Sequence, residues 1–209
     1  MSIAIIQAHV ANVLSTPAKG DAFDARLDEM AAAAGTPLTP KSRKRMRKHT
    51  ATYVDGSVWL LAQVDLVTTQ MGLQAIAAPL IQTAAQYYLA PHDMIPDQAG
   101  LYGLMDDAYL TVRFMTRMSE MFQAQAGVAL YDTSLDEMSP RIRDLIGEPL
   151  ASHLDQTVEN SLALAVQQAN MAAMQPVGFQ DKAAWAQHFR TQERIATETE
   201  IMAIAGGSF

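Results

Sequence analysis

The chain of 209 residues contains no cysteine. Disulfide frameworks, thiolate zinc sites and cysteine nucleophiles are therefore excluded. A reducing compartment fits this composition, and we expect a cytoplasmic protein. Charged residues are also scarce, at 18% of the chain against about 25% in typical soluble domains. This deficit predicts a surface rich in uncharged polar residues, or one that a partner covers.

The sequence is also short of positive charge. The net charge of −7 argues against general nucleic-acid binding. The N-terminus lacks the positive flank and long apolar core of a secretory signal. The uncharged run from Leu66 to Ala90 exceeds the roughly 20 residues that a membrane span needs. Because Thr and Gln recur in it and Gly72 and Pro79 interrupt it, we expect a buried helix or a broken helix pair instead.

Apolar periodicity predicts an all-α fold, a bundle of about seven or eight helices around a helix-turn-helix core. No segment alternates like a strand. We expect Asp55-Gly56 to break the third helix and Ser57 to cap the next one. The expected helices cover 1–14, 21–34, 39–54, 57 onwards to the central turn, 106–122, 134–146, 149–174 and 181–205.

Two apolar stripes flank the central turn. The first has helical spacing and comprises Ile81, Ala84, Ala85, Tyr88 and Leu89. The second comprises Leu110, Phe114, Met118, Met121 and Phe122, with Arg113, Arg117 and Glu120 on the opposite face. The long helix after residue 149 has its own stripe, and its polar residues His153, Asp155 and Glu159 are typical of a solvated face.

The composition suggests three parts of the chain. Residues 1–50 are expected to form an N-terminal helical arm that carries the basic run Lys41–Lys48. Residues 51–130 form the helical core, and residues 131–209 a C-terminal helical pair packed on it. The basic residues spread around most of a helix, which is typical of a solvated helix. The alternatives are binding to an acidic partner, nucleic acid or anionic lipid headgroups, and docking on an acidic surface of the same protein or of a neighbouring subunit.

The stretch between the two stripes is the candidate site. Pro91 and Pro96 prevent a regular helix, while Gly100 and Gly103 permit tight or left-handed geometry. A turn between antiparallel helices would gather the nearby aspartates in one neighbourhood. These are Asp93, Asp97, Asp106 and Asp107.

Helical phase separates the last two aspartates. If the Leu110–Phe122 helix extends back to Asp106, that residue lies on the face of Arg113. Asp107 lies within the apolar stripe instead. A carboxylate that faces the core must be neutralised, hydrogen-bonded or bound to a cation.

Two interpretations of these aspartates remain. In the favoured one, they cap helices and bind turn amides. In the other, they bind a divalent ion such as Mg²⁺, Mn²⁺ or Zn²⁺ together with a histidine. The candidate ligands are His92, Asp93, Asp97, Asp106 and Asp107. The His92-Asp93 dipeptide also resembles that of all-α metal phosphohydrolases, with His49 and Asp155 as further members of the set.

Part of this stretch resembles a known family. The pattern is Tyr88-Leu89-x-Pro91-x-Asp93-x-Ile95-Pro96-Asp97, followed by Gly103-x-x-Asp106-Asp107-Ala108. It is similar to the signature of the YkvA-like family, a small bacterial helical domain of unknown function. The resemblance covers about residues 75–125 and departs from the family at Ala90 and Met94. It implies a helical fold and importance of the four aspartates, and it implies no activity.

Together these features favour a binding or assembly module with a protein partner or a second copy of the chain. The uncharged helices and small-residue faces support burial against such a partner. A metal-dependent hydrolase built on the aspartates is the first alternative, although no obvious nucleophile or general base lies outside that cluster. Peripheral membrane association through the basic run is the second. No cofactor is expected apart from that metal ion.

Overall fold

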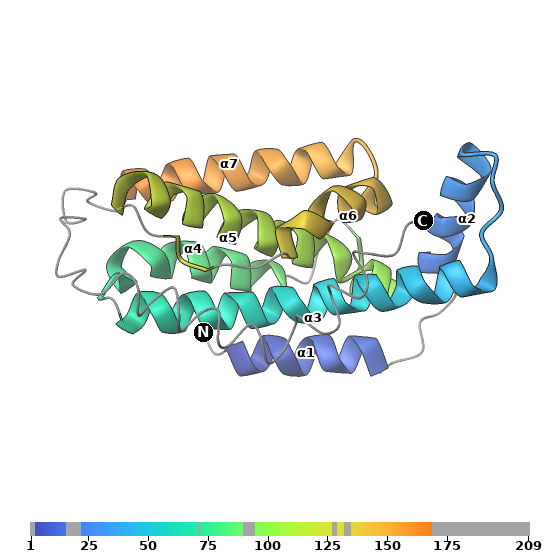
Figure 1. The fold of residues 1–209 in the computed structure, drawn as a ribbon. Coiled ribbons are helices and arrows are strands. Elements are labelled where there is room, and N and C mark those ends of the chain that lie inside the picture. Colours follow the sequence, from blue (N-terminus) through green and yellow to red (C-terminus); the bar gives the residue numbers. More distant parts are fainter. Residues whose placement is uncertain are drawn as a thin grey trace.

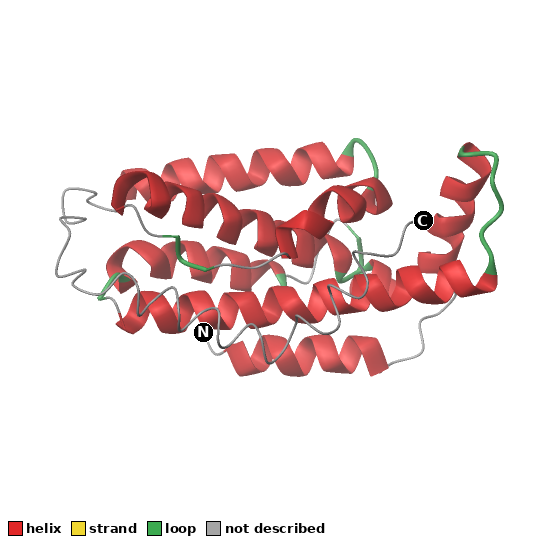
Figure 2. Cartoon of the chain, in the orientation of Figure 1, coloured by secondary structure: helices red, strands yellow, loops and turns green. Residues whose placement is uncertain are grey.

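The structure is a computed structural model that describes residues 3–15, 22–70, 72–89, 95–126, 129–131 and 135–168. Every regular element in this part of the chain is helical, which confirms the all-α prediction (Figure 2). The elements are α1 (Ile3–Ser15), α2 (Ala22–Ala33), α3 (Pro40–Gln70), α4 (Gln74–Tyr87), the 3₁₀ segment η1 (Asp97–Tyr102), α5 (Met105–Ala126), the 3₁₀ segment η2 (Leu135–Met138), α6 (Ser139–Ile146) and α7 (Leu150–Gln168).

Four long helices form the bundle. α3 packs on α4 and α5, and these two also contact each other and α7 (Figure 1). α1 lies outside the bundle against α3 and η1, whereas α2 crosses near the start of α3. The core thus lies between α3 and the α4–α5 pair and continues beneath α7.

The expected break at Asp55-Gly56 is wrong, because α3 continues through it. Gly56 serves close packing: a Cβ added there would lie 2.9 Å from Cδ1 of Leu135. Ser57 is not a cap; its hydroxyl donates to the carbonyl of Val54 at 2.7 Å and also bonds the Tyr88 hydroxyl. The same helix passes through the domain boundary expected at residue 50.

Of the two forms expected for the uncharged run, the structure shows the broken helix pair. α3 ends at Gln70, Gly72 turns the chain with a φ of 70°, and α4 begins at Gln74. Left-handed geometry of this kind favours glycine. No helix among the described residues has the length and apolar character needed to cross a bilayer.

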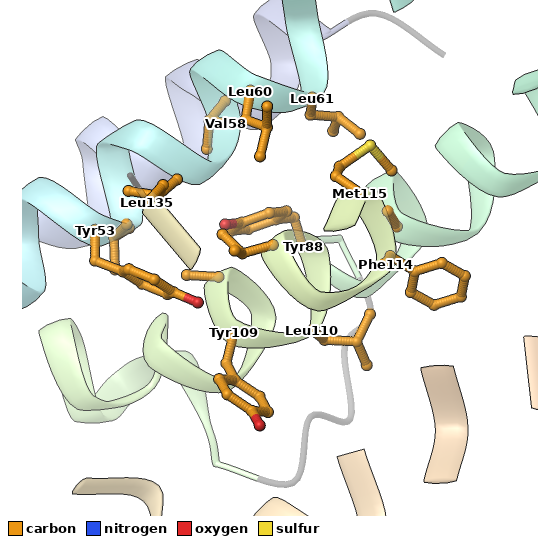
Figure 3. Packing of buried hydrophobic residues seen from close by; sticks show 14 of the residues in the cluster. Tyr53, Val58, Leu60, Leu61, Tyr88, Tyr109, Leu110, Phe114, Met115 and Leu135 are labelled. Atoms are coloured by element: carbon orange, nitrogen blue, oxygen red, sulfur yellow. The ribbon is translucent and has the colours of Figure 1, made fainter. Parts of the chain in front are cut away.

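The two predicted apolar stripes form the centre of the core (Figure 3). Phe114 and Met118 of α5 are fully buried, as are Ala84 and Tyr88 at the end of α4. α7 adds Leu154 and Val158. The predicted helix 149–174 is described as far as Gln168, and the predicted helix 181–205 lies outside the described residues.

An arginine of α2 binds the C-terminal end of α6. The Arg26 guanidinium donates to the carbonyl of Leu145 at 2.8 Å and to that of Asp144 at 3.3 Å. These carbonyls belong to the last turn of α6, where backbone acceptors lack helical partners. A cation is also favoured at this helix end by the helix dipole.

Candidate functional site

The turn before α5 is folded tightly on itself. Gly100 has a φ of 65°, the left-handed geometry that the sequence predicted there. Gly103 has an ordinary φ of −70°, so its role is different. A Cβ at Gly103 would collide with the carbonyl oxygen of Pro96 and lie 2.9 Å from the Cα of Asp97. Gly103 is therefore required by close backbone approach.

Asp106 and Asp107 are both buried, each with 3% of its surface exposed. Asp107 faces the core, as predicted. Asp106 lies in the first turn of α5 and shares the face of Arg113, as helical phase predicted, and the turn before α5 covers it there. The backbone N–H of Ile95 donates to Oδ2 of Asp106 at 3.3 Å. This is the kind of contact that the capping interpretation predicts.

Asp97 has a partner that the sequence analysis missed. Nε2 of His9, on α1, lies 3.0 Å from Oδ2 of Asp97, and both side chains are half-buried. His9 is the one titratable residue in α1 and adjoins its buried residues Ile6 and Val10. That position was the signal in the sequence, since a polar residue beside a buried stripe needs a partner.

The metal prediction stays a prediction. His92 and Asp93 lie outside the described residues. Within the described part of the chain, no group of three histidine, aspartate or glutamate side chains converges in a way that could hold an ion.

Buried tyrosines of the core carry hydroxyl groups that form hydrogen bonds with serines (Figure 3). The Tyr88 hydroxyl shares a hydrogen bond with Ser57, and the Tyr53 hydroxyl shares one of 2.9 Å with Ser139. Burial raises the pKa of Tyr88 and that of Tyr53, while the serine hydrogen bonds oppose the rise. Both phenols are therefore protonated at neutral pH and act as hydrogen-bonding groups within the core.

A second polar region lies further along α5. It is a cavity of about 240 Å³ bounded by α5, η2, α6 and α7. The side chains that give it polar character are Tyr109, Arg113, Asp136, Ser139, Arg143 and Asp155. We refer to it below as the Asp155 pocket.

Asp155 is the centre of this pocket. The Tyr109 hydroxyl donates to its Oδ1 at 2.8 Å, and Nε of Arg143 donates to its Oδ2 at 3.2 Å. Nε of Arg113 is more distant, 3.6 Å from Oδ1. Burial raises the pKa of Tyr109, and its hydrogen bond to Asp155 raises it further, so the phenol remains a donor.

Glu159 is exposed, as the predicted solvated face of α7 requires, whereas Asp155 is only partly exposed in the pocket. Arg113 and Arg117 of α5 contact these two carboxylates in the same order, as parallel neighbouring helices allow (Figure 1). The two arginines are four residues apart, and so are the two carboxylates. This matching spacing of opposite charges was the signal in the sequence. His153 is exposed, as expected.

The residues proposed to complete a His-Asp hydrolase site have other neighbours. Asp155 is bound by Tyr109 and Arg143. His49 lies beside Arg45 and Arg141, and burial together with these cations lowers its pKa.

No protein-family model matches this chain, and comparisons with curated proteins and with solved structures find no similar protein. The resemblance to the YkvA-like family therefore remains a prediction from the residues that carry it.

Proposed function

We propose that this protein is a binding and assembly module that associates with a second copy of itself through the outer face of α1. The observation that carries the proposal is the absence of charge on an outer helix. Among the described helices, α1 and α4 contain no Asp, Glu, Lys or Arg. α4 is enclosed by three other helices, whereas α1 lies on the outside of the bundle (Figure 1).

The two faces of α1 differ in how they pack. Ile6 and Val10 are buried against the body of the protein. The opposite face consists of small side chains, Ala4, Ala8 and Ala11, all exposed. At its edge, Ile5 has 54% of its surface exposed. Small side chains let a second helix approach closely, and the apolar edge supplies area to bury.

Charge favours a second copy as the occupant. Two chains with a net charge of −7 each repel one another across most surfaces. A contact through an uncharged helix places no like charges face to face. In a two-fold symmetric dimer the same patch meets itself, so a face without charge is self-compatible.

The test is to place one charge at the centre of this face. Ala8→Glu keeps helix propensity high and introduces two carboxylates into a symmetric contact. We expect light scattering coupled to gel filtration to give a dimer mass for the wild type and a monomer mass for this variant.

A matched control is available on α7. Leu164 has 57% of its surface exposed, close to the value for Ile5. Leu164→Glu should therefore leave the dimer intact. A wild type that is monomeric at every concentration, or an Ala8→Glu variant that remains dimeric, would contradict the proposal.

A metal-dependent hydrolase is the second candidate. It is favoured by the burial of two adjacent carboxylates, Asp106 and Asp107, because buried carboxylates often compensate their charge with a cation. Thermal unfolding of chelator-treated protein with added Mg²⁺, Mn²⁺, Ca²⁺ or Zn²⁺ tests it. An ion that raises the melting temperature in the wild type but not in Asp107→Asn would support the metal site. No response to any ion would exclude it.

The membrane alternative depends on the basic run of α3. Two of its arginines have partners on α2: Arg43 pairs with Asp28, and Arg47 pairs with Asp24 at 3.1 Å. Arg47 also lies over the Phe23 ring, 5.3 Å from its centroid. These contacts are what docking on the protein's own acidic surface predicts. Flotation with anionic liposomes at low and high salt tests membrane association, since salt screens electrostatic attachment.

A further inference from the structure

We propose that the Asp155 pocket binds a small zwitterion, a molecule of amino-acid size that carries one anionic and one cationic group. The pocket lies between α5, η2, α6 and α7, whereas the proposed dimer contact is on α1. The two proposals are independent. Nothing in the YkvA-like resemblance concerns these residues, most of which lie beyond its range.

The balance of charge selects the class of ligand. Two arginines, Arg113 and Arg143, and two aspartates, Asp136 and Asp155, line the cavity, so the formal charge of the lining is zero. A simple anion would be attracted by the guanidinium groups but repelled by the carboxylates beside them. A zwitterion can place each of its charges next to the opposite one. Its own net charge of zero matches that of the lining.

Arg113 is the group that can accept the anionic end. Its contacts are long, 3.5 Å from Nη1 to Oδ1 of Asp136 and 3.6 Å from Nε to Oδ1 of Asp155. At these distances a hydrogen bond is weak. The guanidinium has five N–H donors in a planar fork that matches a carboxylate in bidentate geometry. A ligand carboxylate can therefore make stronger hydrogen bonds to Arg113 than its present neighbours do.

Asp136 is the group that can accept the cationic end. Its side chain is 38% exposed at the edge of the cavity, and its contact with Arg113 is the long one. An ammonium group has three donors and would bind a carboxylate of this kind directly. Because Asp136 and Arg113 are neighbours, the two ends of an α-amino acid could meet both at once.

Asp155 and Arg143 hold the site in place. Asp155 is fixed by Tyr109 and Arg143, and Arg143 also bonds the Ser152 hydroxyl at 3.0 Å and Glu148 at 2.6 Å. These short contacts leave Arg143 less available than Arg113. The volume of about 240 Å³ is below the roughly 300–1,000 Å³ typical of pockets for drug-sized ligands, so it suits a molecule of few atoms.

The first experiment uses defined probes. Thermal unfolding and titration calorimetry would be run with a panel of free amino acids, with acetate as an anion and with methylammonium as a cation, at equal ionic strength. We expect at least one amino acid to bind and raise the melting temperature, because a ligand that binds the native state stabilises it. Acetate and methylammonium should have much smaller effects. Binding of acetate as tight as that of every amino acid, or no binding by the panel, would overturn the proposal.

Variants then assign the site. Arg113→Gln and Asp136→Asn should each weaken binding of the amino acid roughly tenfold or more, since each removes a charge-assisted hydrogen bond. Arg117→Gln is the matched control: Arg117 lies one turn further along α5 and pairs with Glu159 outside the pocket. Circular dichroism checks that all three are folded. Equal loss of binding in Arg117→Gln, or unchanged binding in Arg113→Gln and Asp136→Asn, would refute the assignment.

Discussion

Two pairs of aspartates, one at the start of α5 and one in the Asp155 pocket further along it, have opposite surroundings. Asp106 and Asp107 are enclosed where the turn after α4 meets the helix, each with 3% of its surface exposed. Asp136 and Asp155 line an open cavity and are neighbours of arginines. The first pair is conspicuous in the sequence, and the second is scattered over distant segments. The pair that is easily noticed in the sequence is therefore buried, whereas the pair that a ligand can reach comes together only when the chain folds.

The two pairs differ in exposure because different parts of the chain cover the start of α5 and the Asp155 pocket. The turn before α5 packs backbone against backbone at Gly103, and the carboxylate of Asp106 binds an amide of that turn. Further along α5, two short segments, η2 and α6, bridge α5 and α7 and leave a cavity between them. We therefore expect substitutions in the first region to destabilise the fold and substitutions in the second to change ligand binding.

The largest effect is expected at Gly103. Gly103→Ala places a Cβ against the backbone of Pro96 and Asp97, which cannot move without opening the turn. We expect the free energy of unfolding to fall by about 3 kcal/mol, as for severe overpacking. Urea denaturation measures it. Gly72→Ala is the control: its φ of 70° carries strain, but no atom lies within 4 Å of the added Cβ, so the loss should be about 1 kcal/mol.

The next largest effect is the difference in stability between variants of the two aspartate pairs. Asp106→Ala leaves the buried N–H of Ile95 without its carboxylate acceptor, and we expect a loss of about 2 kcal/mol. Asp136→Ala removes a long contact at a partly exposed position, and its cost should be below about 0.5 kcal/mol. Chemical denaturation of both variants measures the difference. Equal losses would show that the contrast between the two regions is wrong.

A smaller effect is expected from the buried phenol. Tyr88→Phe removes the hydroxyl that bonds Ser57 but keeps the ring in the core. Ser57 retains the carbonyl of Val54 as an acceptor, so the loss should be about 1 kcal/mol. The same denaturation experiment measures it. A loss above that of Asp106→Ala would mean that the phenol, and not the turn, dominates this region.

The smallest effect depends on pH. Burial, followed by the cations Arg45, Arg141 and Lys48, lowers the pKa of His49 below its usual value of 6.5. The folded state therefore disfavours protonation, so this contribution to stability is complete above pH 6.5 and is lost as the pH falls toward the lower folded pKa. His49→Asn should flatten the pH dependence of the melting temperature in this window. A melting temperature with the same pH dependence in His49→Asn as in the wild type would contradict this prediction.

Much of the fold was predictable because it depends on local periodicity. The stripes ending at Leu89 and beginning at Leu110 predicted the two central helices, and Gly72 indicated an interruption of the uncharged run. The error at Gly56 has a tertiary cause. Whether a glycine ends a helix or makes room for a neighbour depends on Leu135, which lies far along the chain.

The candidate sites were less predictable for the same reason. Helical phase correctly predicted that Asp107 faces the core, but it could not show that the preceding turn would also cover Asp106. The pairing of Asp97 with His9 joins segments that no local pattern relates. To predict the Asp155 pocket, one would have to know that α5 and α7 are parallel neighbours. The indication in the sequence was the matching spacing of opposite charges on the two helices.

The most direct test of this contrast is thermal unfolding of Asp106→Ala and Asp136→Ala with and without a mixture of free amino acids at millimolar concentration. We predict that Asp106→Ala melts well below the wild type yet is still stabilised by the mixture. Asp136→Ala should melt close to the wild type and show no stabilisation. The reverse pattern, with ligand stabilisation lost in Asp106→Ala and retained in Asp136→Ala, would contradict the account.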